Sequence, residues 1–412
     1  MAVDRRQILQ GMGGAVALGA SGLLARAAAA AEKTPLVSGL PAGVYDSATL
    51  AALPGKKPLI RLSDRPPNYE TPAAYFTAPI TPNEAFFVRY HLADIPEKID
   101  ADAWTLRVGG DGASASLELG LRELESGFEP VEIAAVCQCS GNRRGLSEPH
   151  VPGVQWGVGA MGCALWKGVR LKDVLAKAGL RKEAVEIVLD GADGPVIDKT
   201  PDFVKSIPLW KALDDSTIIA FAMNGAPLPH FNGFPARLVV PGWTATYWMK
   251  HLTSIMVSTK PFDGFWVKNA YRIPTGKFPL VQHFETQVTA ANEPITEMVV
   301  NSLIAAPADG HKLRAGQAVE VKGVAWDGGY GIRRVEVSSD GGETWRAARL
   351  GTDHGRFAFR PWSFRFAAAK PGRYAILAKA SNAIGQTQAE TLIFNPAGYH
   401  NNVMRPLTVT VA

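Results

Sequence analysis

The sequence predicts an α+β domain over residues 61–290, followed by an all-β sandwich of immunoglobulin-like size over residues 293–412. Short apolar, β-rich runs that alternate with segments of three- and four-residue apolar spacing indicate the first domain. The second is indicated by a change of pattern near Asn292, after which apolar and polar residues alternate between near-regular Gly/Asp turns. An apolar content of 47% and a charged content of 20% fit a folded globular chain.

Residues 1–31 are predicted to be an export signal that is not part of the fold. Arg5 and Arg6 precede a stretch rich in Gly, Ala and Leu, and Ala29–Ala31 fits a cleavage site. The apolar stretch is short and rich in glycine, which disfavours the alternative of a membrane anchor. We therefore expect a periplasmic protein that is exported folded by the twin-arginine route. Residues 32–60 contain many Pro and Gly residues and predict an irregular N-terminal arm.

In the first domain, the run EAFFVRY (84–90) predicts an extended strand between prolines, and VEIAAVCQCSG (131–141) predicts a strand that ends in a turn. Helical spacing predicts short helices over SLELGLREL (116–124) and GVRLKDVLAKAGL (168–180). In the second domain, the Asp-Gly-Gly turns at Asp327 and Asp340 predict hairpins, with calcium loops as the less favoured alternative.

Charge and cysteine content restrict the classes of function. Loss of residues 1–31 removes three arginines and one aspartate, so the formal net charge falls from +5 to +3. This excess suits small anions and is too weak to indicate nucleic-acid binding. The three cysteines Cys137, Cys139 and Cys163 leave at least one free thiol, and a bond between Cys137 and Cys139 would close a strained ring. The sequence contains no C-x-x-C-H motif, so a covalently bound haem is not expected, and it contains no Cys/His spacing that would predict a zinc site.

The stretch VCQCSGNRRG (136–145) places Cys139 at the end of an apolar strand, directly before a turn and two arginines. Arginine beside a cysteine stabilises its thiolate and offers bidentate donors to an oxyanion. Without a nearby general base, this arrangement favours a soft-metal ligand beside an anion pocket over a hydrolase nucleophile. A buried core cysteine beside two surface arginines remains the competing interpretation.

Two further groups of residues supply polar side chains. Arg89 and His91 are two positions apart on a predicted strand, so they share a face that suits a cofactor or anion, although a structural histidine would also explain it. Arg237, Lys250 and Tyr271 each lie at the edge of an apolar run beside aromatic residues. Singly each is an ordinary surface residue, whereas together they could bind a phosphorylated ligand.

The chain resembles the sulfite oxidase family of molybdenum enzymes, and most closely the bacterial periplasmic sulfite dehydrogenases without a fused haem domain. The resemblance covers essentially the whole chain after the signal. It rests on the motifs ITPNEAFFVRYH, CQCSGNRRG, GVQW…GAMGCALWKGVRLKDVL, FAMNGAPLPHFNGFPARLVVPG, KHLTSI and GVAWDGGYGIRRVEVSSDGGETW, which occur in the family's order. It implies a mixed sulfite-oxidase-type molybdopterin domain followed by an immunoglobulin-like dimerisation domain.

The resemblance also implies roles for single residues. Cys139 matches the family's thiolate ligand of molybdenum, whereas Cys137 and Cys163 have no counterpart. Arg89 and Arg144 match arginines that hold sulfite or sulfate, and Trp156 and Tyr271 match aromatic residues that close the substrate pocket. His91 and Tyr271 are both expected to supply hydrogen bonds to the substrate. The implied cofactor-binding residues are Phe87, Val88, Arg89, Tyr90, His91, Cys139, Asp193, Asn232, Arg237, Trp248, Met249 and Lys250.

Some positions depart from the family's pattern. Tyr90 stands where many members have asparagine, and Asn232 stands where vertebrate members have histidine. Many members have an arginine in the tail, where this chain has NPAGY with Ala397 at that place, and Arg405 is a candidate replacement. The Glu-Cys-Ala-Ala-Asn pattern of sulfane dehydrogenase subunits does not occur. No cytochrome b5-type His-Pro-Gly-Gly segment or flavin domain is recognised, which disfavours a nitrate reductase.

The implied function is oxidation of sulfite to sulfate at a molybdenum–pyranopterin centre. Electrons would pass one at a time to an external c-type cytochrome, because no haem is expected in this chain. We expect a homodimer through the C-terminal domain or a heteromer with the cytochrome, with no nucleic-acid partner and no membrane span in the mature chain. The alternatives are a molybdenum enzyme that acts on another sulfur oxyanion or a sulfoxide, and a non-catalytic periplasmic module that binds anions or transfers electrons.

Overall fold

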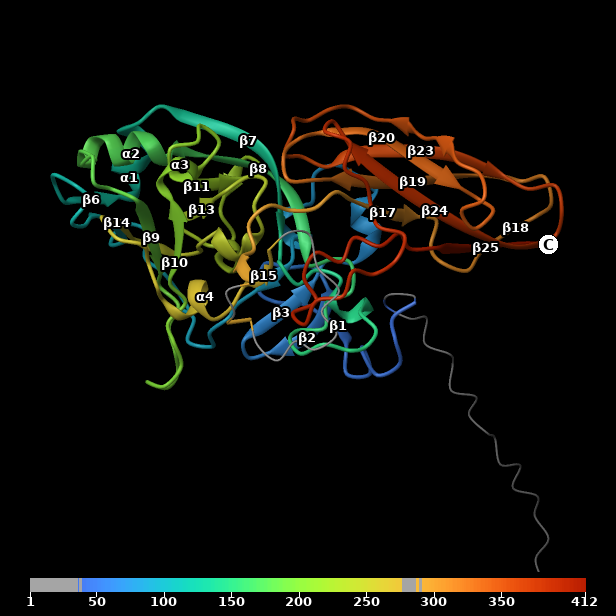
Figure 1. Cartoon of the computed structure of the whole chain (residues 1–412), viewed down its shortest axis with the longest axis horizontal. Coiled ribbons are helices and arrows are strands. Elements are labelled where there is room, and N and C mark those ends of the chain that lie inside the picture. The colour runs from blue at the N-terminus through green and yellow to red at the C-terminus, as the bar shows by residue number, and fades with distance from the viewer. Residues whose placement is uncertain (1–35, 37–38, 276–286, 289–290) are drawn as a thin grey trace, which may run out of the picture. The chain divides into compact units, whose positions relative to one another are not determined.

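The computed structural model describes residue 36 and residues 39–275, 287–288 and 291–412 (Figure 1). The predicted export signal over residues 1–31 lies outside the described residues. Leu36–Ala412 form one compact unit. Within the ranges described, no helix combines the length and the apolar character that a membrane crossing requires.

The first sheet is antiparallel and contains β1 (Thr49–Ala51), β2 (Leu59–Asp64), β3 (Pro67–Glu70) and β4 (Val88–Arg89), in that order. The prediction of an irregular arm over residues 32–60 was therefore wrong where β1 and the start of β2 lie. These strands are short and separated by Pro and Gly, so they show too little alternation to be recognised from the sequence.

The run EAFFVRY was predicted as one strand, which was also wrong for most of its length. A 3-10 turn covers Asn83–Ala85, and β4 contains only two residues. Phe86 and Phe87 instead pack into the main apolar core with stacked rings. The apolar residues of this run are therefore apolar because they are buried in the core, and they do not indicate a strand.

A second sheet has the order β10-β9-β14-β5-β6, and helix α2 (Leu171–Ala178) contacts it. Its strands are β5 (Thr105–Gly109), β6 (Leu117–Gly120), β9 (Glu186–Gly191), β10 (Lys205–Pro208) and β14 (Leu252–Ser258). Helix α2 confirms the helical spacing, since its residues at three- and four-residue intervals are buried and Gly179 ends it with a positive φ of 71°. Of the predicted helix over residues 116–124, only the second half is helical. It forms the start of α1 (Leu121–Ser126), whereas the first half is β6.

A third sheet positions the cysteines. Its order is β12-β11-β8-β7, with β13 paired to β11. Its strands are β7 (Pro130–Gln138), β8 (Met161–Arg170), β11 (Ile218–Met223), β12 (Ala226–Pro227) and β13 (Arg237–Val239). The remaining elements of this part are α3 (Leu209–Ala212), α4 (Phe265–Lys268) and the pair β15 (Arg272–Pro274) with β16 (Asn292–Pro294), together with 3-10 turns over Ala73–Thr77, Arg144–Leu146, His230–Asn232 and Ala245–Tyr247.

The C-terminal part consists of two sheets, as the alternating pattern predicted. One has the order β17-β19-β23-β22 and the other β18-β25-β24-β20-β21 (Figure 1). The strands are β17 (Asn301–Ala306), β18 (His311–Leu313), β19 (Ala318–Trp326), β20 (Ile332–Ser338), β21 (Arg346–Ala347), β22 (Arg349–Leu350), β23 (Arg360–Ala367), β24 (Gly372–Asn382) and β25 (Leu407–Val411). Inward residues of both sheets form one apolar core, for example Val321 and Phe366 with Val335 and Val409. That the sandwich is of the immunoglobulin type stays a prediction.

Candidate active site

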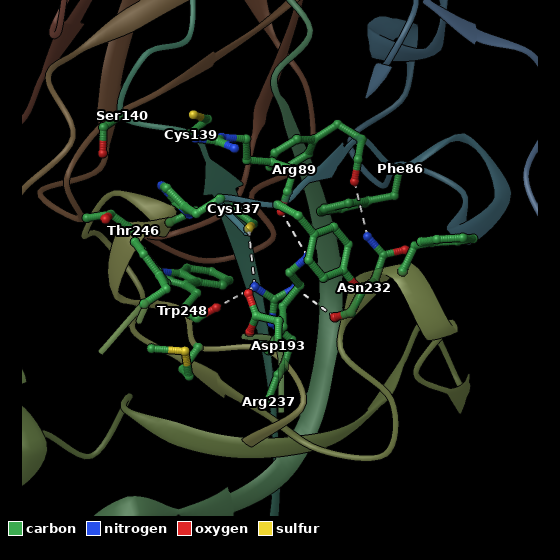
Figure 2. Close-up of a pocket in the computed structure, with 18 of the residues that line it drawn as sticks. Phe86, Arg89, Cys137, Cys139, Ser140, Asp193, Asn232, Arg237, Thr246 and Trp248 are labelled. Atoms are coloured by element: carbon green, nitrogen blue, oxygen red, sulfur yellow. Dashed lines mark hydrogen bonds between the residues drawn. The ribbon is translucent and has the colours of Figure 1, made fainter. Parts of the chain in front are cut away.

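A pocket opens where chain-distant segments of the first domain meet (Figure 2). Its walls come from the residues around β4, the end of β7, the loops after β9 and β13, and a 3-10 turn. The lining residues are Phe86, Phe87, Arg89, Tyr90, His91, Cys137, Cys139, Ser140, Asp193, Phe203, Phe231, Asn232, Arg237, Ala245, Thr246, Trp248, Met249, Lys250 and Tyr271. Most of the residues that the sequence assigned to the site therefore lie together.

Cys139 is the first residue after β7. Its backbone N–H donates to the carbonyl of Ala160 (2.9 Å), and its carbonyl accepts from the N–H of Asn142 (2.9 Å), which closes the predicted turn. The side chain lines the pocket and is nearly buried. No group of three or more His, Cys, Asp or Glu residues that could hold a metal occurs among the described residues. A metal at Cys139 would thus need most of its ligands from a bound group.

Arg89 projects from β4 beside Cys139 (Figure 2). One guanidinium nitrogen, Nη1, donates to Asn68 Oδ1 (3.2 Å). Burial lowers the pKa of Arg89, and the nearby Cys139 opposes that shift. The structure thus places a partly buried cation beside the thiol in one pocket, an arrangement that would suit an anion, and the prediction of an anion site next to a thiolate stays a prediction.

The two adjacent arginines after Cys139 point to different places. Arg144 donates from Nε to the carbonyl of Ala397 (2.7 Å) and from Nη1 to the carbonyl of Val154 (3.0 Å). Arg143, with a φ of 70°, donates to Asn301 Oδ1 and to the carbonyl of Val403 (2.7 Å), both in the C-terminal part. Arg143 therefore ties the turn to the C-terminal domain.

Arg144 is not among the described residues that line the pocket, contrary to its predicted position, because its guanidinium binds backbone carbonyls. It still lies near the site, since the charge of a Cys139 thiolate counteracts the lowering of its pKa by burial. Its guanidinium also lies 5.4 Å from the ring centroid of Tyr399. Its role as an anion-binding arginine stays a prediction.

Trp156 and Val88 were also expected in the site, but neither is among the described lining residues, because both side chains point into the core with no exposed surface. The buried side chain of Glu70 accepts hydrogen bonds from the backbone that follows Trp156. It accepts from the backbone N–H groups of Gly157 and Gly159 (2.7 Å each) and from the hydroxyl of Tyr45 (2.5 Å). This network fixes the chain directly after Trp156.

His91 and Tyr271 form the aromatic wall of the pocket. His91 Nε2 and the Tyr271 hydroxyl share a hydrogen bond, and the imidazole stacks on Phe203 with 3.7 Å between ring centroids. Burial, with smaller contributions from cations such as Arg89, holds the pKa of His91 well below its ordinary value. The imidazole is therefore neutral at neutral pH. Tyr399 of the tail stacks on Tyr271 with an interplanar angle of 9°.

The region predicted to bind the cofactor contains Arg237, which lies between Trp166 and Trp248, with 5.1 and 5.7 Å from its guanidinium carbon to their ring centroids. It donates to the carbonyls of Asn232 (2.9 Å) and Trp248 (3.0 Å). The Asn232 side chain in turn donates to the carbonyl of Phe87 (3.1 Å). Figure 2 shows these contacts at the pocket end away from Cys139.

Lys250 reaches into the same region. Its Nζ donates to the carbonyl of Arg89 (2.8 Å) and lies over the ring of Tyr90. Burial holds the pKa of Lys250 well below its ordinary value, and Asp193 opposes that shift. Burial raises the pKa of Asp193, and Lys250 opposes that shift. The site thus contains a lysine and an aspartate, each of which moves the pKa of the other back toward its ordinary value.

Tyr90 presents its ring to the pocket, whereas its hydroxyl is 2.7 Å from Nε2 of His251. Nδ1 of His251 donates to the carbonyl of Phe234 (2.6 Å), and burial lowers the pKa of His251 to about 3. Because the imidazole is neutral with its proton on Nδ1, Nε2 accepts from Tyr90. The tyrosine at this position is therefore anchored behind the pocket.

The other two cysteines are free and buried. Cys137 lines the pocket 3.9 Å from Nη2 of Arg237, and burial raises the pKa of its thiol to about 11. Cys163 lies in a separate apolar cluster with Phe76 and Trp326, and burial raises the pKa of its thiol to about 12. Both thiols stay protonated at neutral pH. The sequence did not indicate that Cys137 belongs to the pocket wall.

The residues of the pocket fit a molybdopterin. Ser140 Oγ, Thr246 Oγ1 and Arg237 Nε are buried polar atoms with no hydrogen-bond partner among the residues that the structure describes. All three belong to lining residues, so a ligand with many polar atoms would supply the missing partners. Cys139 offers the soft donor that molybdenum would take.

Sequence reasoning missed Phe203 and Tyr399, which pack on His91 and Tyr271, and it left open whether Arg405 replaces the tail arginine. Arg405 donates to the carbonyl of Gly39 (2.8 Å), and its charge acts on Arg143. It therefore does not take the place of the tail arginine at the pocket. A Phe within a Pro- and Asp-rich loop and a Tyr in the tail carry no periodic signal, so the sequence offered little to detect them.

Comparisons with known proteins agree with this geometry. The family model for the oxidoreductase molybdopterin binding domain matches residues 91–266, and that for the Mo-co oxidoreductase dimerisation domain matches residues 292–411. The mitochondrial sulfite oxidase of Rattus norvegicus is 35% identical over an alignment of 374 positions that covers 87% of this chain and 67% of the rat protein. The NAD(P)H nitrate reductase of Hordeum vulgare is 30% identical over an alignment of 397 positions that covers 87% of this chain and 42% of that protein. The sulfane dehydrogenase SoxCD from Paracoccus pantotrophus has a similar fold, with a TM-score of 0.72, 25% identity, and coverage of 84% of this chain and 85% of the other.

Proposed function

Because the chain belongs to the sulfite oxidase family of molybdenum enzymes, we propose that it oxidises sulfite to sulfate and passes the electrons singly to an external c-type cytochrome. In balanced form, sulfite and water give sulfate, two protons and two electrons. The observation that carries the proposal is the partly buried guanidinium of Arg89 beside Cys139 in one pocket. A cation at this place would bind the sulfite dianion next to the thiolate ligand.

The molybdenum cofactor, when bound, would supply oxygen-atom transfer and a store for two electrons. Cys139 would be its protein ligand, and Arg237 and Lys250 would bind its pterin and phosphate. The other side chains act on the substrate. Arg89 neutralises and orients the anion, and the hydroxyl of Tyr271, held by neutral His91, offers a hydrogen bond at the pocket wall.

The test is sulfite-dependent reduction of ferricyanide and of cytochrome c by the purified protein, with molybdenum content measured on the same sample. The proposal predicts turnover together with molybdenum in a near one-to-one ratio to the chain. Correctly exported protein without molybdenum would favour an anion-binding module. Molybdenum without sulfite turnover would favour another sulfur substrate, which assays with sulfane compounds and sulfoxides would identify.

The assembly and location belong to the same proposal. The match to a dimerisation domain over residues 292–411 supports a homodimer, and a heteromer with the cytochrome is the competing arrangement. Light scattering on the purified protein, with and without a c-type cytochrome, distinguishes the two. The motif at Arg5 and Arg6 supports export to the periplasm. Cell fractionation of the R5K/R6K double variant tests it, and unchanged export would contradict the twin-arginine route.

A further inference from the structure

Lys205, at the start of β10, is a fully buried lysine behind the wall of the pocket. Its Nζ donates to the carbonyl of Trp266 (2.5 Å). The same atom lies 5.2 Å from the ring centroid of Tyr271 and 4.7 Å from that of Tyr247. The ammonium group is therefore enclosed by aromatic faces and one carbonyl, an arrangement that favours the cation only weakly.

The charged groups around Lys205 do not neutralise it. Glu186 on β9 is the carboxylate that favours its charged form, but that side chain accepts from Ser206 Oγ (2.8 Å) and from the backbone N–H of Phe262 (2.5 Å). Arg272 on β15 repels it. Burial, followed by Arg272, lowers the pKa of Lys205 to about 7. Lys205 thus changes its charge at neutral pH, which is unusual for a lysine.

The charge of Lys205 can influence the pocket through its contact with the ring of Tyr271. Tyr271 lines the pocket and shares its hydroxyl with His91, whereas Lys205 is behind the ring and does not belong to the described lining. A cation near the face of a phenol withdraws electron density and makes its hydroxyl a better donor. Lys205 is also one of the cations that lower the pKa of His91, so its charge acts at the aromatic wall.

We propose that Lys205 is a positioning residue that couples a proton to oxyanion binding in this pocket: its protonated form holds Tyr271 and strengthens binding of a sulfur oxyanion. The inference rests on the proposed function, because it takes the ligand to be a dianion. Binding of that dianion favours the charged form of Lys205 and draws a proton from solvent. Affinity therefore falls as the pH rises through the range in which Lys205 loses its proton.

Sulfate is the suitable probe, because it remains a dianion across the neutral range, whereas sulfite changes its own protonation there. Sulfate binding to the holoenzyme is measured by titration calorimetry between about pH 6 and about pH 8.5, in buffers with different ionisation enthalpies. If the bound dianion raises the pKa of Lys205 by about one unit, sulfate affinity falls about tenfold across this range, which corresponds to about 1.4 kcal/mol. Net proton uptake is expected near pH 7 to 8 in the unmodified protein.

Two variants separate charge from structure. In K205R the charge persists across the range, so sulfate should bind tightly with little dependence on pH. In K205M the charge is absent, so sulfate should bind weakly and again with little dependence on pH. A merely structural role would leave the pH dependence of the unmodified protein in both variants. The matched control is Lys268→Met on α4, whose side chain is 61% exposed, and it should behave like the unmodified protein.

Three results would overturn the inference: K205M with the original pH dependence, K205R with the original pH dependence, or no proton uptake on sulfate binding by the unmodified protein. The last needs no variant and so does not depend on how well the variants fold. Sulfite turnover measured in parallel keeps the two proposals apart. Turnover and sulfate binding without proton uptake reject only the role of Lys205, whereas absence of both turnover and sulfate binding rejects the proposed function as well.

Discussion

Replacement of Arg89 by glutamine should raise the KM for sulfite strongly and leave the fold almost unchanged. Arg89 donates one hydrogen bond to Asn68 Oδ1, at 3.2 Å, and its side chain also interacts with Cys139 in the pocket. A hydrogen bond to a charged group contributes about 1.5–3 kcal/mol, so the loss of one to two such bonds to the dianion costs about 3 kcal/mol. That free energy corresponds to an increase of KM by about 150-fold.

The same change should have little effect on stability. Glutamine can keep a neutral hydrogen bond to Asn68, and its removal of a buried cation relieves the desolvation that lowers the pKa of Arg89. We therefore expect the free energy of unfolding to change by about 1 kcal/mol or less, which moves Tm by only a few degrees. The KM of an Arg89→Lys variant should lie between those of the unmodified protein and of Arg89→Gln, because lysine keeps the charge but lacks the planar guanidinium donors.

The assay is steady-state oxidation of sulfite with ferricyanide, together with molybdenum content and Tm for each variant. Arg122→Gln is the control, because the side chain of Arg122 is 87% exposed and distant in sequence from the site. An unchanged KM in Arg89→Gln that retains its molybdenum would refute the assignment of Arg89 to the substrate. A KM that rises only with loss of molybdenum would assign Arg89 to the cofactor instead.

Four other substitutions test the remaining parts of the site. Cys139→Ser should abolish turnover with a change of Tm of only a few degrees, because the nearly buried side chain is almost isosteric; retained turnover refutes the ligand assignment. Arg143→Met should lower stability by about 1.5–3 kcal/mol, since it removes bonds to buried acceptors, with KM unchanged; a raised KM at unchanged Tm contradicts its structural role. Lys250→Met should lower the molybdenum content of the protein. A molybdenum content equal to that of the control Lys268→Met, which changes an exposed lysine, would reject a contact between Lys250 and the cofactor. His91→Asn should lower kcat/KM about tenfold through one lost hydrogen bond. Because the pKa of His91 lies well below its ordinary value, inflections of the pH profile above about pH 6.5 should not move.

The sequence predicted the chemistry of the site better than its geometry. Cys139, Arg89 and Lys250 each lie at the edge of an apolar run, so their residue types and positions indicated an anion site beside a thiolate. Their convergence could not be derived from spacing, because 50 residues separate Arg89 from Cys139 and 111 separate Cys139 from Lys250. Only the resemblance to a family placed these segments around one pocket.

The errors have a common physical cause, which is that side-chain direction is fixed by tertiary partners. Trp156 is fully buried, and the backbone directly after it is hydrogen-bonded to Glu70, 86 positions earlier. Arg144 binds carbonyls from two distant segments, and Lys205 is buried although lysine is usually exposed. No local pattern encodes such partners. The helix α2 and the C-terminal strands were predictable because their burial follows a regular period.

The charges of the pocket would allow an anionic cofactor to share it with the anionic substrate that we propose. The described lining contains the cations Arg89, Arg237 and Lys250 against one carboxylate, Asp193, and burial lowers the pKa of all three cations. A phosphate near Arg237 and Lys250 would relieve part of this imbalance and leave the charge of Arg89 for the substrate. Sulfite and sulfate carry similar charge, so fixed cations alone favour neither and would also retain the product. A cation that loses its proton near neutral pH behind the pocket wall, as we propose for Lys205, would weaken that retention without a change in the residues that contact the anion.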